Sequence, residues 1–269
     1  MKIGFSTLGC PEWSWKEIVA AAKDLGYDGI ELRGVGNEMY MPKAQPFTPE
    51  NIQSTKSMLD ELGLEIPCIT SACYLFKEDV DRYISEGKDY IDIASKLQSP
   101  YIRVLGDRHP HPGEDIDHGK VASALDELGE YAKDRGVMVL IESNGVYANS
   151  RTLLALLEGL KSDNIGIVWD IHHPYRFMNE DIEDTYERLK GFIRHVHVKD
   201  SICVDDKVKY CLLGQGDIPL EQALELLKAD GYKGYLSLEW VRRWYYGLEE
   251  PGIVFPHFIY TVKDMLENV

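Results

Sequence analysis

Four residues of metal-binding type stand at the ends of four apolar segments of this chain. They are Glu142, Asp170, His197 and Glu239. Residue 170 follows residue 142 by 28 positions, and residue 197 follows residue 170 by 27, which is about the length of one strand-plus-helix unit. Such spacing places side chains at the same end of successive parallel strands, where barrel proteins assemble metal sites from distant parts of the chain.

The chemistry of these four residues indicates a divalent cation. Any one of them alone is compatible with a polar strand end, but three buried carboxylates close together repel one another and need a counter-charge. Three oxygen ligands and one imidazole suit Mn²⁺ best, with Mg²⁺, Co²⁺ or Zn²⁺ as alternatives, because structural zinc sites favour thiolates or several imidazoles. We therefore expect one divalent metal ion.

These residues must be positioned by the elements around them. The chain repeats one unit eight times, which consists of an apolar run, a loop and an amphipathic helix. This alternation predicts a parallel sheet, and eight runs in 269 residues predict an α/β single-domain (β/α)8 TIM barrel over residues 1–269, with its active site at the C-terminal ends of the strands. The predicted strands are Lys2–Ser6, Gly29–Arg33, Glu65–Ser71, Tyr101–Leu105, Val137–Ser143, Ile165–Asp170, Ile193–Val198 and Gly234–Glu239.

Two loops on the strand-exit side are longer than the usual few residues. They are Asn37–Thr48 and Ser201–Asp217, and the pattern around Asp205 and Asp206 in the second predicts a small hairpin. His109 and His111 lie in the loop after the fourth strand, where a solvated position is the expectation.

Composition limits the cellular context and the partners. No run approaches the roughly 18 apolar residues that span a bilayer, and the odd number of cysteines, five, with no Cys-x-x-Cys pair disfavours a disulfide framework. A net charge of −16 disfavours nucleic-acid partners. We expect a cytoplasmic protein without membrane contact, which acts on a small molecule and is a candidate homo-oligomer.

With these motifs identified, the chain resembles the xylose isomerase-like barrel superfamily, in the sugar phosphate isomerase/epimerase branch that includes ketose 3-epimerases and inosose dehydratases. The resemblance covers essentially the whole chain. The resemblance rests on Glu142, the Asp-x-x-His run Asp170-Ile171-His172-His173, the His-x-x-Asp run His197-Val198-Lys199-Asp200, and Glu239. It implies that Glu142, Asp170, His197 and Glu239 bind the metal, that Glu142 and Glu239 also exchange protons, and that His173 contacts the substrate.

This resemblance implies a metal-dependent sugar isomerase or epimerase that deprotonates the carbon next to a carbonyl and forms an enediolate. An inosose-type dehydratase or carbon–oxygen lyase uses the same ligands and is the alternative. Apurinic endonucleases share both signatures but need further histidines on early strands, where this chain has Glu31-Leu32-Arg33 and Thr70-Ser71-Ala72. The absence of a glycine-rich phosphate loop favours a non-phosphorylated sugar.

Further substrate-contact candidates lie near the same strand ends. Strand alternation favours His172 over His173, whereas the family spacing favours His173. Arg103 is expected either to hold a substrate hydroxyl or to pair with a carboxylate, and Trp240 is placed to stack on a sugar face. Glu31 and Lys199 complete this set, and His195 is expected to be a packed interior histidine.

Overall fold

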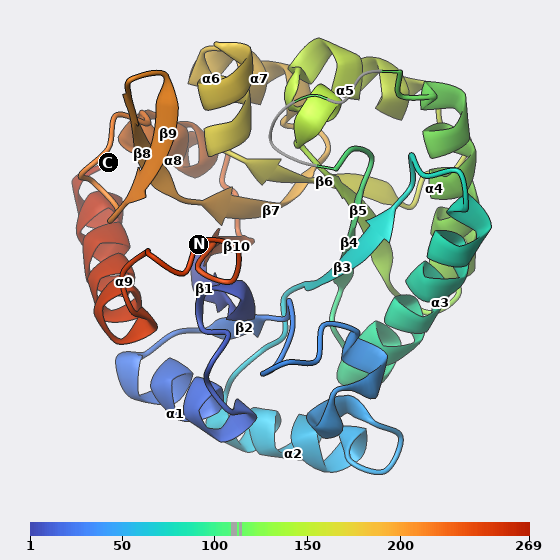
Figure 1. Cartoon of the computed structure of the whole chain (residues 1–269), viewed down its shortest axis with the longest axis horizontal. Helices are drawn as coiled ribbons and strands as arrows, with labels where there is room; N and C mark the ends of the chain where they lie inside the picture. Colours follow the sequence, from blue (N-terminus) through green and yellow to red (C-terminus); the bar gives the residue numbers. More distant parts are fainter. Residues whose placement is uncertain (109–111, 113–114) are drawn as a thin grey trace.

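Eight parallel strands form a barrel surrounded by helices (Figure 1). The computed structural model describes residues 1–108, 112 and 115–269. Around the sheet the strands follow the order β2-β1-β10-β7-β6-β5-β4-β3, so the predicted barrel is confirmed. Their bounds are β1 (Lys2–Ser6), β2 (Gly29–Glu31), β3 (Ile69–Tyr74), β4 (Tyr101–Leu105), β5 (Met138–Glu142), β6 (Ile165–Asp170), β7 (Ile193–Val198) and β10 (Tyr235–Leu238).

The barrel closes between β2 and the segment that leads into β3. Parallel bridges pair Gly29 with Glu65 and Leu32 with Ile69, and the backbone N–H of Ile30 donates to the carbonyl of Glu65 over 2.9 Å. This seam is irregular, because the third strand begins at Ile69 and continues to Tyr74 instead of covering 65–71 as predicted. The longer exit of β3 brings Tyr74 to the end of the barrel where the candidate site lies.

Nine helices surround the barrel in the described ranges, and their apolar faces pack on the strands. In the first helix, Ser14 and Glu17 form a reciprocal capping box and Gly26 ends the helix with a left-handed conformation, while Ile18 and Ala22 are fully buried. The helices are α1 (Trp15–Leu25), α2 (Ile52–Leu62), α3 (Val80–Leu97), α4 (His118–Lys133), α5 (Ser150–Glu158), α6 (His172–Met178), α7 (Ile182–Leu189), α8 (Leu220–Ala229) and α9 (Pro251–Asn268).

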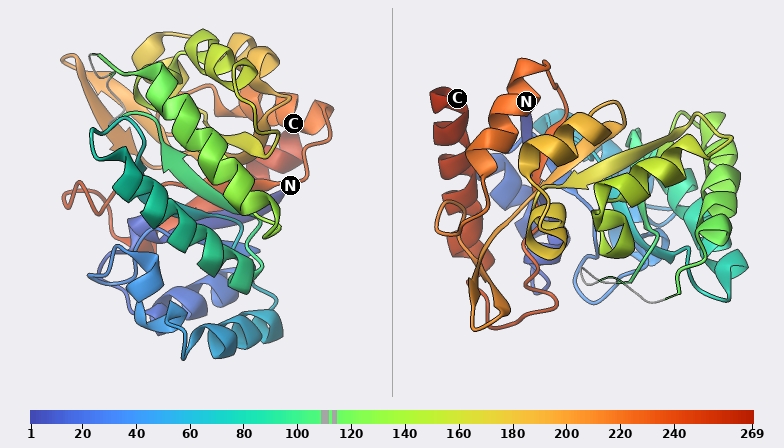
Figure 2. Two further views of the ribbon diagram at one scale, coloured as in Figure 1. Left: turned by 90° about the vertical axis from the view of Figure 1, so that its right-hand side faces the viewer. Right: turned by 90° about the horizontal axis from the view of Figure 1, so that it is seen from above.

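The hairpin predicted after the seventh barrel strand is confirmed. Strands β8 (Asp200–Val204) and β9 (Lys207–Cys211) pair antiparallel, and the two turn residues, Asp205 and Asp206, have φ angles of 49° and 59°, as a tight two-residue turn requires. The hairpin projects from one end of the barrel (Figure 2).

The expected loop after β2 contains two 3₁₀ turns, η2 (Met41–Lys43) and η3 (Gln45–Phe47), and two others, η1 (Thr7–Gly9) and η4 (Gly145–Ala148), follow β1 and β5. His109 and His111 lie outside the described residues. Within the described ranges, none of the helices combines the length and the apolar character needed to cross a bilayer.

Candidate metal centre and substrate cavity

The four predicted ligands lie together at the C-terminal end of the barrel. The Nδ1 atom of His197 is 3.3 Å from Glu142 Oε1, 3.6 Å from Glu239 Oε1 and 3.9 Å from Asp170 Oδ2. Strand register explains this convergence, because His197 on β7 pairs directly with Asp170 on β6, while Glu142 ends β5 and Glu239 follows β10. We call these four residues the tetrad.

The tetrad fits a divalent cation. Metal–ligand bonds of about 2 Å place neighbouring donor atoms about 3–4 Å apart, which is the range that surrounds His197 Nδ1. Burial opposes a charge on this ring, yet the carboxylates of Glu31, Glu239 and Glu142 outweigh burial and raise the pKa of His197 well above its ordinary value. The surroundings therefore favour a positive charge at this place, which is what a bound metal ion would provide.

Asp170 divides its two oxygens between the backbone and the tetrad. Its Oδ1 accepts the backbone N–H groups of His172 and His173, each over 3.0 Å, which satisfies two donors at the start of α6. Its Oδ2 faces His197 and the ammonium of Lys199. Asp170 has no exposed surface, and burial raises its pKa.

Lys199 is a buried counter-charge for two members of the tetrad. Its Nζ donates to Asp170 Oδ2 and, over 2.6 Å, to Glu239 Oε2. Burial opposes its charge, but Asp170 and Glu239 outweigh burial and raise its pKa. Lys199 does not line the cavity described below, so the structure places it beside the carboxylates instead of at the expected substrate contact.

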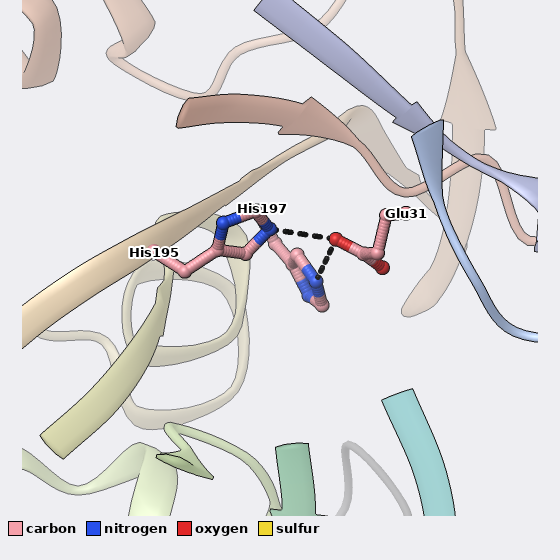
Figure 3. Close-up of side chains that lie close together, drawn as sticks. All are labelled: Glu31, His195 and His197. Carbon is pink, nitrogen blue, oxygen red and sulfur yellow. Dashed lines mark hydrogen bonds and ion pairs between the residues drawn. The ribbon is translucent and has the colours of Figure 1, made fainter. Parts of the chain in front are cut away.

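Glu31 lies beneath the tetrad and not at the mouth of the barrel, where we expected it. One oxygen of its carboxylate, Oε2, lies 2.7 Å from His195 Nε2 and 3.1 Å from His197 Nε2, and Figure 3 shows this oxygen in contact with both rings. Burial opposes its ionisation, but His197 and His195 outweigh burial and hold its pKa well below the ordinary value. Histidines that bind metals usually donate their second ring N–H to such a carboxylate. His195 is a buried interior histidine, as predicted.

A cavity of about 290 Å³ opens above the tetrad. This volume lies near the lower end for small-molecule sites. Glu142, Glu239 and His173 line it, whereas Asp170 does not. Of the three carboxylates in the tetrad, two therefore reach the space in which a ligand would lie.

His173 and His172 occupy different positions. His173 lines the cavity, and its Nδ1 lies 3.2 Å from the carbonyl oxygen of Ser143; burial and then the charge of Lys199 lower its pKa to about 3. His172 is fully buried, with its Nε2 at 2.8 Å from Ser201 Oγ. Strand alternation gave the wrong order because β6 ends at Asp170 and helix α6 begins at His172.

Arg103 joins the cavity wall to the tetrad. Its Nε lies 3.0 Å from Glu142 Oε2, and its NH1 group donates to the carbonyl of Ser71 over 2.9 Å. Burial opposes ionisation of Glu142, but Arg103 and then His197 outweigh burial and lower its pKa. The two expectations for Arg103 are compatible, since it pairs with a carboxylate and also lines the cavity.

Trp240 is a packing residue and not a stacking platform. It is 1% exposed, and its Nε1 donates to the carbonyl of Glu249 over 3.0 Å. The reason is strand phase, because consecutive residues point to opposite faces and Glu239 faces the cavity. The exposed aromatic residues in the cavity wall are instead Trp244 and Tyr245.

Sequence reasoning missed five polar residues of the cavity wall, of which Arg108 and Tyr245 are exposed and three reach it from unexpected places. These three are Tyr74, Asn144 and Tyr210. Tyr74 lies on the unexpected extension of β3, and Asn144 follows Glu142 by two positions, which was an available signal. Tyr210 comes from the hairpin strand β9, and nothing in its local sequence indicates that it folds back over the barrel.

Asp200, the second residue of the His-x-x-Asp spacing, fixes a loop. Its carboxylate accepts backbone N–H groups from Ser201, Gly214 and Gly216 over 2.9 Å each. A Cβ on Gly216 would lie 1.9 Å from Asp200 Oδ1, so this close approach requires glycine.

Comparisons with known proteins agree with the fold. A model of the xylose isomerase-like TIM barrel family matches residues 19–254. Fructoselysine 3-epimerase of Escherichia coli O157:H7 is 25% identical over 258 residues, which cover 90% of each chain. Inosose isomerase of Halalkalibacterium halodurans is 28% identical over 261 residues, which cover 91% of this chain and 87% of the relative. A crystal structure titled as IOLI protein with a bound zinc atom superposes with a TM-score of 0.81 at 20% identity, covering 100% of this chain and 99% of that one.

Proposed function

Because the chain belongs to the xylose isomerase-like TIM barrel family, we propose that it is a divalent-metal-dependent isomerase or epimerase of a ketose or related keto-sugar. Relatives named as a 3-epimerase and an isomerase support the reaction class. The tetrad would hold the ion through Glu142, Asp170, His197 and Glu239. Mn²⁺ is the first candidate on the basis of the oxygen-rich donor set, and Mg²⁺, Co²⁺ and Zn²⁺ are the alternatives.

One observation carries this proposal: Glu142 and Glu239 are the two tetrad carboxylates that line the cavity. They come from different parts of the barrel, the end of β5 and the residue after β10. A substrate carbon held between them has a proton acceptor on one side and a proton donor on the other. This is the arrangement that general acid–base catalysis at a single carbon needs.

The reaction that we propose starts with proton removal from the carbon next to the carbonyl. A divalent ion would stabilise the negative charge that develops on the substrate oxygens. Glu142 takes the proton, since Arg103 keeps this carboxylate ionised. Return of a proton by Glu239 on the other face inverts the carbon, whereas return to the neighbouring carbon moves the carbonyl, and no atom is gained or lost in either case.

The other residues of the cavity position the substrate. Neutral His173 offers a ring nitrogen for a hydroxyl group. Arg103 presents its guanidinium to the same space while it holds Glu142 in place. Lys199 fixes Glu239 through Oε2, which leaves Oε1 on the side of His197.

Solvent exchange tests the proposal. Purified protein with added Mn²⁺ is incubated with a panel of ketoses in deuterated water, and the products are analysed by NMR and mass spectrometry. We expect a new epimer or isomer with one solvent deuterium at the carbon next to the carbonyl. Glu142→Gln and Glu239→Gln should each lower the rate of inversion by about 10²–10⁴-fold. Each variant should still exchange a substrate proton for solvent deuterium in the epimer whose C–H bond faces the remaining carboxylate.

Glu130→Gln on the outer surface of α4 is the matched control and should behave as wild type, and metal content is measured for every variant. Loss of water from the substrate would replace this proposal with a dehydratase. Isomerisation without deuterium uptake would indicate a hydride shift and contradict proton transfer by Glu142 and Glu239.

A further inference from the structure

Arg33 is a buried cation in the wall of the cavity, and no carboxylate of the described residues forms an ion pair with it. It is 5% exposed and lines the same space as Glu142 and Glu239. Its NH1 group is buried and has no hydrogen-bond partner among the described residues, and its guanidinium forms no ion pair with any of them. Such an unpaired buried charge is unfavourable in the absence of a ligand.

The position of Arg33 is fixed by the barrel. Its backbone N–H donates to Thr7 Oγ1 over 2.8 Å, and its guanidinium carbon lies 5.8 Å from the ring centre of Trp244. Burial and the nearby guanidinium of Arg103 lower its pKa. The fold therefore holds a planar donor group at the cavity wall under conditions that oppose its charge.

The charge balance of the site gives an independent argument. The tetrad and Glu31 contribute four carboxylates. Three buried cationic side chains face these carboxylates, namely Arg33 and Arg103 in the cavity wall and Lys199 beside the tetrad. A divalent ion in the tetrad would leave one positive charge in excess, which favours a negatively charged ligand.

We propose that the substrate carries an anionic group, a carboxylate or a phosphate monoester, and that the guanidinium of Arg33 binds it. This inference rests on the proposed function and names its substrate class: an acidic keto-sugar whose carbonyl end lies at the tetrad. Guanidinium groups match both anions through paired N–H donors. The site therefore needs no glycine-rich phosphate loop, although the lack of one had favoured a neutral sugar.

Matched substrates test the assignment. D-fructose is compared with D-fructose 6-phosphate and with D-fructuronate, so that the two anionic arms separate phosphate from carboxylate. We expect wild type to prefer one anionic ketose over the neutral sugar. Arg33→Met should lower the ratio of kcat/KM for that ketose to kcat/KM for D-fructose by about 10–100-fold, and Arg33→Lys should lower it less. Arg82→Gln, which removes an exposed arginine that does not line the cavity, should leave the ratio unchanged.

Direct binding provides a readout that does not depend on turnover. Metal-free protein is titrated with inorganic phosphate and with malonate while tryptophan fluorescence is recorded, because Trp244 lies beside Arg33. Wild type and Arg82→Gln should show saturable changes that Arg33→Met lacks. Removal of an unpaired charge should also raise the melting temperature without ligand, by about 2–4 °C.

The outcomes separate this inference from the proposed function. If ketoses are turned over but Arg33→Met affects neutral and anionic ketoses equally, the anion site is wrong and the proposed function stands. If Arg33-dependent anion binding is found but no keto-sugar is converted, the anion site stands and the proposed function fails. A lower melting temperature in Arg33→Met, with unchanged anion binding, would assign Arg33 a structural role and overturn the inference.

Discussion

Glu31 shows how much of the candidate metal site lies outside the tetrad. A single oxygen of its carboxylate contacts both His195 and His197. This contact fixes the ring orientation of His197, the one imidazole in the tetrad. The convergence of the tetrad was predictable, because polar residues at the ends of apolar strands are conspicuous in a sequence. The depth of a residue in the barrel is not visible in this way, and for that reason Glu31 and Lys199 were expected in contact with substrate.

The first prediction concerns this second layer of the site. Glu31→Gln keeps the size of the side chain but removes the charge that orients His197. We expect the affinity for Mn²⁺ to fall by about 10–100-fold, measured by calorimetric titration of the metal-free protein. Glu130→Gln should bind Mn²⁺ as wild type does. An unchanged affinity in Glu31→Gln would show that the Glu31 contact does not support metal binding.

At the scale of elements, the strands were predictable and the segments that leave them were not. Strands β1, β4, β6 and β7 have the predicted bounds, because apolar runs between helices leave few choices of register. Two differences between the predicted and the observed elements have physical causes. Helix α6 begins two residues after Asp170 and changes which histidine faces the cavity, and β3 runs on to Tyr74 because its pairing with β4 shifts register.

A second prediction concerns the seam that closes the barrel. Glu65 accepts hydrogen bonds from Lys2 Nζ and from Tyr235 Oη, over 2.6 and 2.8 Å, so β1, β10 and the segment that leads into β3 are joined at one point. Partial burial opposes ionisation of Glu65, but these two donors outweigh burial and hold its pKa below the ordinary value. A lowered pKa stabilises the folded protein above the pKa of the unfolded chain, and this stabilisation is lost as the pH falls through the folded value.

Glu65→Gln should therefore lower the melting temperature at pH 7, by about 1–3 °C because the pair is half exposed. The difference from wild type should shrink as the pH is lowered from 7 towards 4. Calorimetric scans of both proteins across this range measure it, with Glu130→Gln as the control. A difference that stays constant with pH would mean that the ionised carboxylate is not the source of the effect.

At the scale of the whole molecule, the eightfold repeat of strand and helix was the strongest signal in the sequence. A closed parallel barrel brings the ends of all its strands to one face, so residues 142–239 meet there although almost a hundred positions separate them. The barrel therefore determines that a site exists and where it lies. Its substrate is determined by side chains from loops, such as Tyr210 and Trp244, which the repeat does not specify.

The third prediction follows from the tetrad as a meeting point of four strand ends. A metal ion bound only by the folded state stabilises the whole barrel, and Mn²⁺ at a hundred times its dissociation constant should raise the melting temperature by about 5–10 °C. A chelator should reverse the shift. Asp170→Asn and His197→Ala should abolish it, and equal melting temperatures with and without Mn²⁺ in wild type would argue against a metal in the tetrad.

The β8–β9 hairpin has a consequence for engineering. Its base is anchored because Asp200 accepts N–H groups from both sides of the hairpin, whereas its tip at Asp205 and Asp206 is exposed and projects away from the barrel (Figure 2). Peptide tags, fluorophores or longer turns grafted at the tip would leave the anchor and Tyr210 in place. The turn of the hairpin is thus a suitable site for insertions, and reporters attached there would require no redesign of the barrel.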